Sequence, residues 1–366
     1  MIWLHTLSPF VVRFWDDVGI RWYGLAYLAG FGVAYLLLRW LSKRRLIAIP
    51  YERVGDALIW FIGGALVGGR LGYALVYDPA LFYHFSGAFP WWGLLAINQG
   101  GMASHGGMVG VIIAGWIVSR WNLRTPPPES APLTPGSAFM HVCDVVAFIC
   151  PAGLFFGRLA NFVNGELLGK IVAKPGEAAP WWAVQYPQEL DLCHTDPVTL
   201  ATSPGRELVQ TPEQWNQVLR LAETLAPAPT PEGLREGLHR LAHEAWRHSP
   251  QLNEQLKTLV SSRHPSQLYQ AAAEGLVLGA VLWLAWARPR KPGVIGSVFL
   301  IVYGILRILT ELIRLPDAQL VTQRWMGLSR GQWLSVGMIV AGVAVIGYAA
   351  RRAGPRLGGW AGRGKA

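Results

Sequence analysis

Long apolar runs separated by short polar connectors dominate this chain. Seven runs of about 20 residues carry few charges, and each could cross the roughly 30 Å hydrocarbon core of a bilayer as one helix. The runs span residues 20–40, 54–77, 98–119, 142–163, 266–287, 294–314 and 331–350. This pattern predicts an all-α integral membrane protein with seven transmembrane helices.

A polar segment, residues 170–262, interrupts the pattern between the fourth and fifth runs. It holds a Pro-rich linker at 226–231 and helical patterns around 213–225 and 232–246. We expect this insert to form a small extracytoplasmic cap that serves substrate access rather than chemistry. The chain is thus predicted to comprise three parts: residues 1–169 with four spans, the insert 170–262, and residues 263–366 with three spans.

The composition agrees with a membrane protein. The 366 residues are 52% hydrophobic and only 15% charged, whereas soluble proteins carry about 25% charged residues. So high an apolar content excludes an intrinsically disordered chain. Three cysteines do not make a disulfide scaffold, and Cys143 and Cys150 share one predicted helix, about 10 Å apart by helix rise.

The net charge of +10 does not indicate nucleic-acid binding. Residues 171–262 hold 7 Lys or Arg and 11 Asp or Glu, which leaves 25 of the 32 basic residues and 11 of the 22 acidic ones elsewhere. Those basic residues flank the apolar runs, where they set orientation beside anionic headgroups. We therefore expect membrane lipids as partners and no nucleic acid.

Basic residues are divided unequally between the two sides of the membrane. Fifteen lie in the connectors 39–53, 120–141 and 288–293 and in the C-terminal tail, against 5 in the opposite set outside the insert. Because positive charge stays inside, the N-terminus is predicted outside and the C-terminus in the cytoplasm. Residues 1–19 lack a continuous apolar core and suit an interfacial segment on the outer surface.

Charged side chains inside spans cost about 2.5–3.5 kcal/mol each on insertion scales, so each one is a functional candidate. On the predicted topology, polar clusters at the outer ends of six spans converge on the outer leaflet. The clusters contain Tyr23, Arg70, His105, Arg158 with Asn161 and Glu166, Arg263 with Gln267, and Arg307 with Glu311 and Arg314. The sequence therefore predicts a site that faces outward.

Some of these residues have structural alternatives. Gly64, Gly68 and Gly72 form a small-xxx-small ladder, which we expect to pack two helices closely. Arg70 could line a site or snorkel to the headgroups. Arg307 could belong only to an intrahelical charge network.

His105 opens the third run and is followed by Gly106 and Gly107. A neutral imidazole is a natural base near pH 7, and glycines let a backbone or a substrate approach closely. A structural histidine at a helix start is the alternative. The arginines expected at similar depth favour a catalytic or orienting role.

Arg158 and Asn161 share one helical face at the end of the fourth run. The arginine fork matches phosphate oxygens, with the amide as a neutral partner. Gly165 and Gly169 are expected to break the helix into a flexible outer end. The alternative is an Arg158–Glu166 ion pair that only ties the bundle together.

Arg263 closes the insert, and Pro265 suits the first turn of the fifth helix. A helix N-terminus also favours an anion, so this position is a second candidate phosphate site. A simple juxtamembrane anchor is the alternative.

At this point several motifs in order resemble one family, the bacterial prolipoprotein diacylglyceryl transferases. The resemblance covers nearly the whole membrane portion. The motifs are Trp22–Leu25, Gly68–Tyr73, Gly100–Met102 with His105–Gly107, Gly157–Gly169, Arg263–Tyr269 and Arg314–Gln319.

The resemblance implies a reaction. The diacylglyceryl group of phosphatidylglycerol moves to the lipobox cysteine thiol of a prolipoprotein, and a thioether and glycerol phosphate result. It implies a bacterial inner-membrane protein in which Arg158 and Arg263 hold the lipid phosphate and His105 acts on the thiol. The remaining site residues that it implies are Tyr23, Asn161, Glu166 and Gly169. Arg70 and Gln267 are further substrate-binding candidates because of their place in the outer clusters.

The sequence departs from the family pattern at three places. Lys170 stands where arginine is common, which keeps the charge and loses the fork. Gln270 stands where glutamate is common, although Glu274 remains nearby. The insert is longer than usual.

Two other functions compete with this interpretation. An outer-leaflet lipid or anion transporter could also use intramembrane arginines, and an assembly protein could use them only to join helices.

Neither a phosphate-loop nor a dinucleotide glycine motif is present, and no zinc-type spacing appears, so we expect no cofactor and no metal. His239 and His243 could bind a metal, with a solvated helix face as the alternative. Phe89, Trp91 and Trp92 could frame a lateral lipid entrance.

Overall fold

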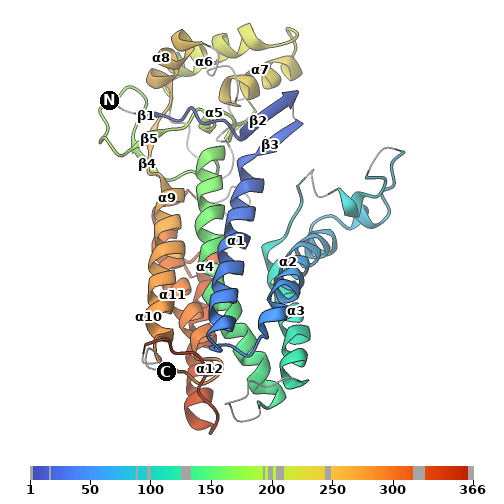
Figure 1. Cartoon of the computed structure of the whole chain (residues 1–366). Helices are drawn as coiled ribbons and strands as arrows, with labels where there is room; N and C mark the ends of the chain where they lie inside the picture. The colour runs from blue at the N-terminus through green and yellow to red at the C-terminus, as the bar shows by residue number, and fades with distance from the viewer. Residues whose placement is uncertain are drawn as a thin grey trace. The chain divides into compact units, whose positions relative to one another are not determined.

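The computed structural model describes residues 3–15, 18–87, 90–96, 100–124, 133–192, 194–196, 201–202, 210–243, 249–315 and 326–361 (Figure 1). These residues form two compact units. The first unit contains residues 1–29, 154–277 and 303–338. The second unit contains residues 30–153, 278–302 and 339–366.

Helices make up most of the chain. The helices and helical turns outside the insert are α1 (Trp22–Lys43), η1 (Tyr51–Arg53), α2 (Val54–Val76), η2 (Pro79–Phe82), η3 (Gly93–Leu95), α3 (Ser104–Arg124), α4 (Pro135–Asn164), α9 (Ser266–Gln270), the π-helix η6 (Ala271–Val277), α10 (Leu278–Trp286), α11 (Val294–Glu311) and α12 (Arg330–Arg351). Within the described ranges, six helical segments are long and apolar enough to cross a membrane. They correspond to six of the seven predicted spans: Trp22–Lys43, Tyr51–Val76, Pro135–Asn164, Ser266–Trp286, Val294–Glu311 and Gly331–Arg351.

The remaining predicted span, the third along the chain at residues 98–119, corresponds to α3, which is helical over 21 residues. It is not among the six because polar residues occupy both of its ends, Ser104 and His105 at the start and Arg120, Asn122 and Arg124 toward the end. The helix was predicted correctly, and its apolar middle is shorter than those of the other spans.

Glycines bring α2 and α3 together, as the small-residue ladder predicted. A Cβ atom added at Gly68 would lie 2.4 Å from the carbonyl oxygen of Gly106, and one at Gly64 would lie 2.5 Å from that of Gly110. Distances this short require that both helices carry glycine at the contact. The two helices lie side by side in Figure 1.

A buried acid on α4 caps the N-terminus of α11. Asp144 on α4 accepts hydrogen bonds from the backbone N–H groups of Gly293 and Gly296, at 2.7 and 2.6 Å. It thereby caps the orphan donors of the helix N-terminus. This intramembrane acid therefore has a structural role.

The insert contains the two predicted helices and one that the sequence analysis missed. The patterns at 213–225 and 232–246 correspond to α6 (Pro212–Leu225) and α7 (Pro231–His243), and α8 (Pro250–Leu259) follows. Thr211 begins α6 with a capping box to Gln214. The short helix α5 (Glu189–Leu192) precedes them.

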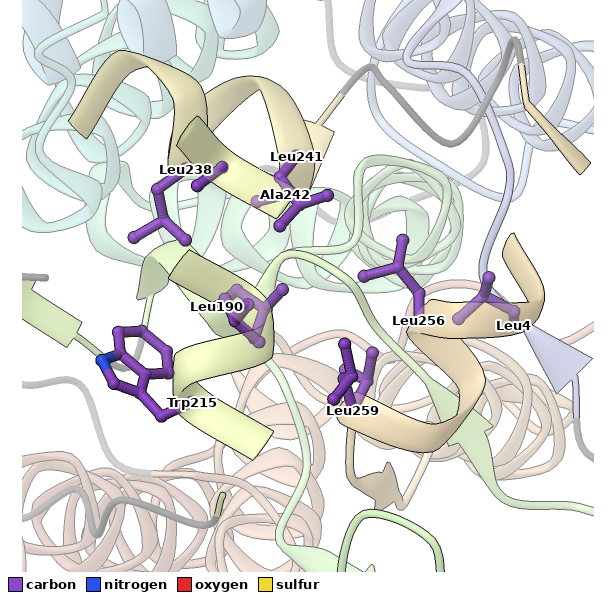
Figure 2. Packing of buried hydrophobic residues seen from close by; sticks show 11 residues of the cluster. Leu4, Leu190, Trp215, Leu238, Leu241, Ala242, Leu256 and Leu259 are labelled. Atoms are coloured by element: carbon purple, nitrogen blue, oxygen red, sulfur yellow. The ribbon is translucent and has the colours of Figure 1, made fainter. Parts of the chain in front are cut away.

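A buried apolar cluster joins these helices to the N-terminal strand (Figure 2). Trp215, Leu241 and Leu256 are almost fully buried in it, at 1%, 0% and 0% exposure. Leu4 comes from the start of the chain and Leu190 from α5. The insert thus has a hydrophobic core of its own, which the N-terminus completes.

The structure also contains short strands, which the all-α prediction did not include. A four-stranded sheet has the order β1 (Trp3–Leu4), β5 (Val184–Gln185), β8 (Ser262–Arg263) and β4 (Ile171–Ala173), and only β1 and β5 run parallel. The other strands are β2 (Phe10–Trp15), β3 (Val18–Arg21), β6 (His194–Asp196) and β7 (Ala201–Thr202). Strands of two or three residues are too short to leave a period-2 pattern in the sequence, so no local signal predicts the four-stranded sheet.

The N-terminal segment predicted to lie on the membrane divides into two parts. Leu4 packs into the core of the insert instead of facing a membrane, and residues from Phe10 onward form the paired strands β2 and β3. Val12, Phe14 and Ile20 are exposed on these strands, at 46%, 59% and 46%. The guanidinium groups of Arg13 and Arg21 lie 5.2 and 4.8 Å from the ring centre of Phe10. Exposed apolar residues beside arginines suit a membrane interface, which stays a prediction.

Candidate active site

Three predicted site residues meet through hydrogen bonds in the first unit. Tyr23, on the first turn of α1, donates its hydroxyl to Glu166 Oε2 at 2.7 Å. Asn161, on the last turn of α4, donates to the hydroxyl oxygen of Tyr23 and to Glu166 Oε2, the latter at 3.3 Å. Asn164 holds the other carboxylate oxygen at 3.2 Å. The carboxylate of Glu166 therefore fixes Tyr23 and Asn161 together.

Glycine ends α4 directly before this carboxylate. Gly165 has φ = +66°, and a Cβ atom there would lie 2.5 Å from the side chain of Gln188. Leu167 also has a positive φ, +55°, which is uncommon for a residue with a branched side chain. A strained residue beside Glu166 marks this loop, residues 165–170, as a functional candidate.

The 165–170 loop was predicted to be flexible, and the structure holds it along its length. Ser266 Oγ donates to the carbonyl oxygen of Leu167 at 2.7 Å, and the amide of Gln267 donates to that of Glu166. Further backbone bonds join Lys170 to Ile313 and His264, and Leu168 to Leu315. The residues after Arg263 therefore hold this loop in place, and we call His264, Ser266 and Gln267 the clamp.

Arg158 forms an ion pair with Glu274 in the first unit. Arg158 Nε lies 3.0 Å from Glu274 Oε2, and the side-chain exposures are 17% and 0%. The predicted alternative partner was Glu166; the acid on the π-helix takes that place. Among the described residues, Nη1 and Nη2 of Arg158 have no hydrogen-bond partner.

Unsatisfied polar atoms accompany this pair on the π-helix and at the last residue of α9. Glu274 Oε1 and both amide atoms of Gln270 are buried without a hydrogen-bond partner among the described residues. Both side chains are fully buried, at 0% exposure. π-Helical turns are rare and frequent at functional sites, and buried orphan groups of this kind call for an explanation by ligand or water.

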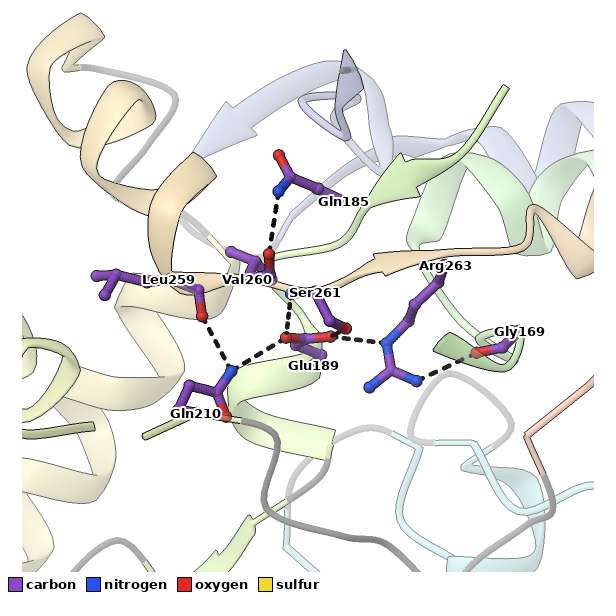
Figure 3. Close-up of polar contacts among 8 residues, drawn as sticks. All are labelled: Gly169, Gln185, Glu189, Gln210, Leu259, Val260, Ser261 and Arg263. Atoms are coloured by element: carbon purple, nitrogen blue, oxygen red, sulfur yellow. Dashed lines mark hydrogen bonds and ion pairs between the residues drawn. The ribbon is translucent and has the colours of Figure 1, made fainter. Parts of the chain in front are cut away.

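Arg263 lies on strand β8 rather than at a helix N-terminus, which begins only at Ser266. Figure 3 shows its guanidinium between Glu189 Oε2, 2.6 Å from Nε, and the carbonyl oxygen of Gly169, 3.1 Å from Nη1. Its side chain is 2% exposed. Sequence reasoning missed Glu189, because one acid in a polar insert resembles any solvated acid.

The guanidinium of Arg70, in the second unit, has all of its donors occupied by carbonyl oxygens. Nε donates to Leu94, Nη1 to Gly100 and Gly101, and Nη2 to Gly93 and Ala96, at 2.5–3.1 Å. The residue is 5% exposed, so it does not snorkel. The structure gives Arg70 the role of holding residues 93–96 and 100–101 to α2, and its predicted contact with substrate would need one of these bonds to open.

His105 lies on the first turn of α3, also in the second unit, and its side chain is exposed. Gly106 faces α2, where an added Cβ would lie 2.2 Å from the carbonyl oxygen of Gly68. The glycines after His105 were expected to admit either a backbone or a substrate; at Gly106 it is the backbone of α2 that comes close. The imidazole is left accessible.

Arg307 and Glu311 form the predicted intrahelical pair on α11, with 3.8 Å between Nη2 and Oε2. Ser329 also donates to Glu311. Arg307 Nη1 is buried without a hydrogen-bond partner among the described residues. Arg314 is described, and Pro316–Gln319 of the last family motif lie outside the described residues, as does Phe89.

Burial changes two titratable groups near the clamp. It raises the pKa of Tyr186, whose hydroxyl donates to Gln267 Oε1 at 3.2 Å. It lowers the pKa of His264, whose ring stacks on Trp182 at 5.1 Å between centres. Both effects favour the neutral form.

The predicted His239–His243 pair is present on α7, with ring centres 4.5 Å apart. In the described part of the chain, no group of three or more His, Cys, Asp or Glu side chains is arranged to hold a metal ion. Two ligands alone do not make a closed site.

Comparison with known proteins decides the family. The family described as "Prolipoprotein diacylglyceryl transferase" matches residues 9–348. The chain belongs to this family. The resemblance stated from the motifs is thereby confirmed, and the comparisons give no support to the transporter hypothesis.

Relatives from this transferase family match almost the full length of the chain. The phosphatidylglycerol–prolipoprotein diacylglyceryl transferase of Bdellovibrio bacteriovorus is 37% identical, over 98% of this chain and 97% of its own length. That of Neisseria gonorrhoeae is 34% identical over 94% and 96%. That of Ectopseudomonas mendocina is 31% identical over 91% of each chain.

Two departures from the transferase family pattern can now be placed. Lys170 is exposed, and its backbone, not its side chain, joins the clamp. Gln270 is fully buried four residues before Glu274, and its amide has no hydrogen-bond partner among the residues described. A neutral amide at position 270 leaves Glu274 as the acid that pairs with Arg158.

Proposed function

We propose that this protein transfers the diacylglyceryl group of phosphatidylglycerol to the lipobox cysteine thiol of a prolipoprotein. Family membership and the names of the relatives support the proposal. The thiol sulfur forms a bond to the glycerol carbon that carries phosphate, and the carbon–oxygen bond breaks. The oxygen leaves with its electron pair on glycerol phosphate, and the thiol proton passes to a base.

The geometry of Arg158 carries the chemical part of this proposal. Glu274 binds the guanidinium through Nε at 3.0 Å, which leaves both terminal nitrogens for another partner. Those nitrogens form the fork that binds two phosphate oxygens. Negative charge grows on the leaving phosphate in the transition state, and a positioned cation stabilises it there.

Tyr23, Asn161 and Glu166 provide a rigid polar group in the same unit. The carboxylate of Glu166 accepts hydrogen bonds from both Tyr23 and Asn161, so neither side chain is free to rotate. We propose that these residues, with Gly169 and Gln267, orient the headgroup. Rigid, preorganised donors are more effective than mobile ones because they need no rearrangement during the reaction.

His105 is proposed to act on the thiol. A thiol with a pKa of about 8.5 is mostly protonated at neutral pH, so a base assists its attack. An exposed imidazole on the first turn of α3 is accessible for this task. The predicted phosphate contact of Arg263 and the predicted substrate contact of Arg70 would each require displacement of internal partners, which already bind their guanidinium groups.

The membrane topology belongs to the proposal as well. We propose seven spans, with α3 as the third, in a bacterial inner membrane. The N-terminus and the insert lie outside and the C-terminus in the cytoplasm, as the distribution of basic residues indicates. Phosphatidylglycerol would then enter sideways, because exposing acyl chains to water costs about 0.8 kcal/mol per CH₂.

A reconstituted assay tests the function. Purified protein, phosphatidylglycerol and a synthetic lipobox peptide should yield a thioether-linked diacylglyceryl peptide and glycerol phosphate, both identified by mass spectrometry. His105→Gln should fold and yield neither product. Absence of a thioether with the unmodified protein would reject the transferase function, and full activity of His105→Gln would reject only the role of the imidazole.

A further inference from the structure

We infer that Glu189 and Arg263 are a positioning pair, by which the insert fixes the 165–170 loop and with it the carboxylate of Glu166. This inference rests on the proposed function and concerns the geometry of the same site. Neither residue needs to touch the substrate. The insert would then contribute to the reaction, rather than only to access.

The pair is buried and short. Arg263 Nε lies 2.6 Å from Glu189 Oε2, and each side chain is 2% exposed. Two charges so far from water remain stable only if each finds further partners. The additional bonds made by each residue therefore decide what the pair does.

Glu189 uses its remaining lone pairs inside the insert. Its Oε1 accepts hydrogen bonds from Ser261 N at 2.7 Å and from the amide of Gln210 at 3.1 Å, and its Oε2 accepts one from Ser261 Oγ. Gln210 also donates to the carbonyl oxygen of Leu259, at the end of α8 (Figure 3). A network satisfied at every oxygen has one arrangement, and it is rigid.

Arg263 transmits that rigidity to the 165–170 loop. Its Nη1 donates to the carbonyl oxygen of Gly169 at 3.1 Å. Gly169 permits this contact because it has no side chain; a Cβ atom there would lie 2.2 Å from the carbonyl oxygen of His264. The same loop carries Glu166, whose carboxylate fixes Tyr23 and Asn161.

The geometry favours positioning over phosphate binding for Arg263. The carboxylate of Glu189 neutralises the guanidinium, and the whole residue is 1% exposed. A lipid phosphate would have to displace Glu189 and be buried in its place. Arg158 presents the opposite arrangement: within the described part of the chain its terminal nitrogens have no hydrogen-bond partner, and its side chain is 17% exposed.

Kinetics on two single variants test the inference. Glu189→Gln keeps the length of the side chain and removes its charge, and Arg263→Gln removes the donor to Gly169. We expect kcat for thioether formation to fall by about 100-fold in both, since a displacement of about 1 Å can cost that much. The KM for phosphatidylglycerol should stay within about twofold of the wild-type value.

Hydrogen exchange measures the loop directly. The amides of Glu166 and Lys170 bond to the carbonyl oxygens of Asn161 and Ile313. In both variants, a peptide covering this loop should exchange about tenfold faster than in the wild type, as expected for a locally opened segment. This readout separates a displaced loop from a general loss of folded protein.

Gln185→Met is the matched control. Gln185 is 3% exposed, and its side chain donates to the carbonyl oxygens of Lys257 and Val260. Among the described residues this side chain makes no hydrogen bond to Arg263 or to the 165–170 loop, although its strand pairs with β8. The control should lower thermal stability and leave kcat and loop exchange unchanged.

A double variant covers the possibility that an unpaired buried charge prevents folding. Glu189→Gln with Arg263→Gln leaves no charge behind, so it should fold even where a single variant does not. It should still show the kcat loss and the faster exchange, because the bond to Gly169 is absent. Recovery of wild-type kcat in the double variant would overturn the inference and leave a purely structural pair.

Other outcomes are equally decisive. A large rise in KM for Arg263→Gln, without a kcat loss in Glu189→Gln, would identify Arg263 as a phosphate ligand and overturn the inference. Wild-type kcat in folded Glu189→Gln would do the same. If the wild-type protein forms no thioether, the proposed function fails, whereas hydrogen exchange still reports whether the pair positions the loop.

Discussion

Two arginine–glutamate pairs of the first unit differ in how many of their guanidinium donors are occupied. Arg158 gives only Nε to Glu274, and its terminal nitrogens have no hydrogen-bond partner in the described part of the chain. Arg263 gives Nε to Glu189 and Nη1 to Gly169, within a network of satisfied bonds. The first pair is arranged to receive an anion, and the second to hold a backbone in place.

The difference shows that an intramembrane or buried arginine does not define a phosphate site by its presence. Arg70 extends the comparison, because five carbonyl contacts occupy its donors with no carboxylate at all. The three arginines differ in how many guanidinium N–H donors remain available once the protein's own acceptors have bound the others. By that criterion Arg158 is the strongest candidate for the lipid phosphate.

The largest effect should come from Arg158→Lys. Lysine can still pair with Glu274, but it offers a point charge in place of a fork. We expect transfer to fall by at least about 100-fold, as for the loss of a donor to a developing charge, with normal expression. Lys170→Arg is the control, because that side chain is exposed and should change little. Near-wild-type transfer by Arg158→Lys would mean that charge alone suffices.

A second substitution acts on Gly169, the backbone partner of Arg263. Gly169→Ala places a methyl group against the carbonyl oxygen of His264, and overpacking of this kind costs about 1–3 kcal/mol. Unfolding should occur at a lower temperature and transfer should fall with the displaced loop. Gly63→Ala adds its methyl group where no atom lies within 4 Å, so it should leave both measurements unchanged. Equal behaviour of the two variants would refute a tightly packed loop.

Glu274→Gln should have a smaller effect on transfer than Arg158→Lys. The amide keeps a hydrogen bond to Nε and removes the charge that orients the guanidinium. We expect kcat to fall by about tenfold, since groups that only orient a functional residue contribute about 10- to 100-fold. The loss should appear in kcat and not in loop exchange, in contrast to Glu189→Gln. Faster exchange of the 165–170 loop in Glu274→Gln would show that the two pairs are not independent.

The smallest effect concerns how the thermal stability depends on pH through His264. Burial lowers the pKa of His264 below its ordinary value of about 6.5. The unfolded chain therefore binds a proton at higher pH than the folded protein, and stability falls as pH drops through that value. The thermal midpoint should decrease slightly from pH 7.5 to pH 5.5. His264→Phe, which keeps a ring against Trp182, should decrease less; an equal decrease would assign the effect to other groups.

Several features follow from local sequence signals. Six spans, α6 and α7, and the end of α4 at Gly165 were predicted, because each depends on a contiguous pattern or on one residue's backbone freedom. The glycine ladder of α2 likewise predicted a close helix contact, which the structure confirms. The family was also identifiable from short motifs in order.

The partners of the charged side chains were decided only by the tertiary structure. Glu274 lies 116 residues from Arg158, and Glu189 lies 74 residues from Arg263. No periodicity links positions so far apart, and an acid in a polar insert carries no local sign that it will be buried. Whether an arginine fork is open or occupied depends on which acceptors the fold brings within about 3 Å, the distance at which a hydrogen bond forms. The sequence alone therefore determined where the arginines stand along the chain, and folding determined which of them is left with free donors.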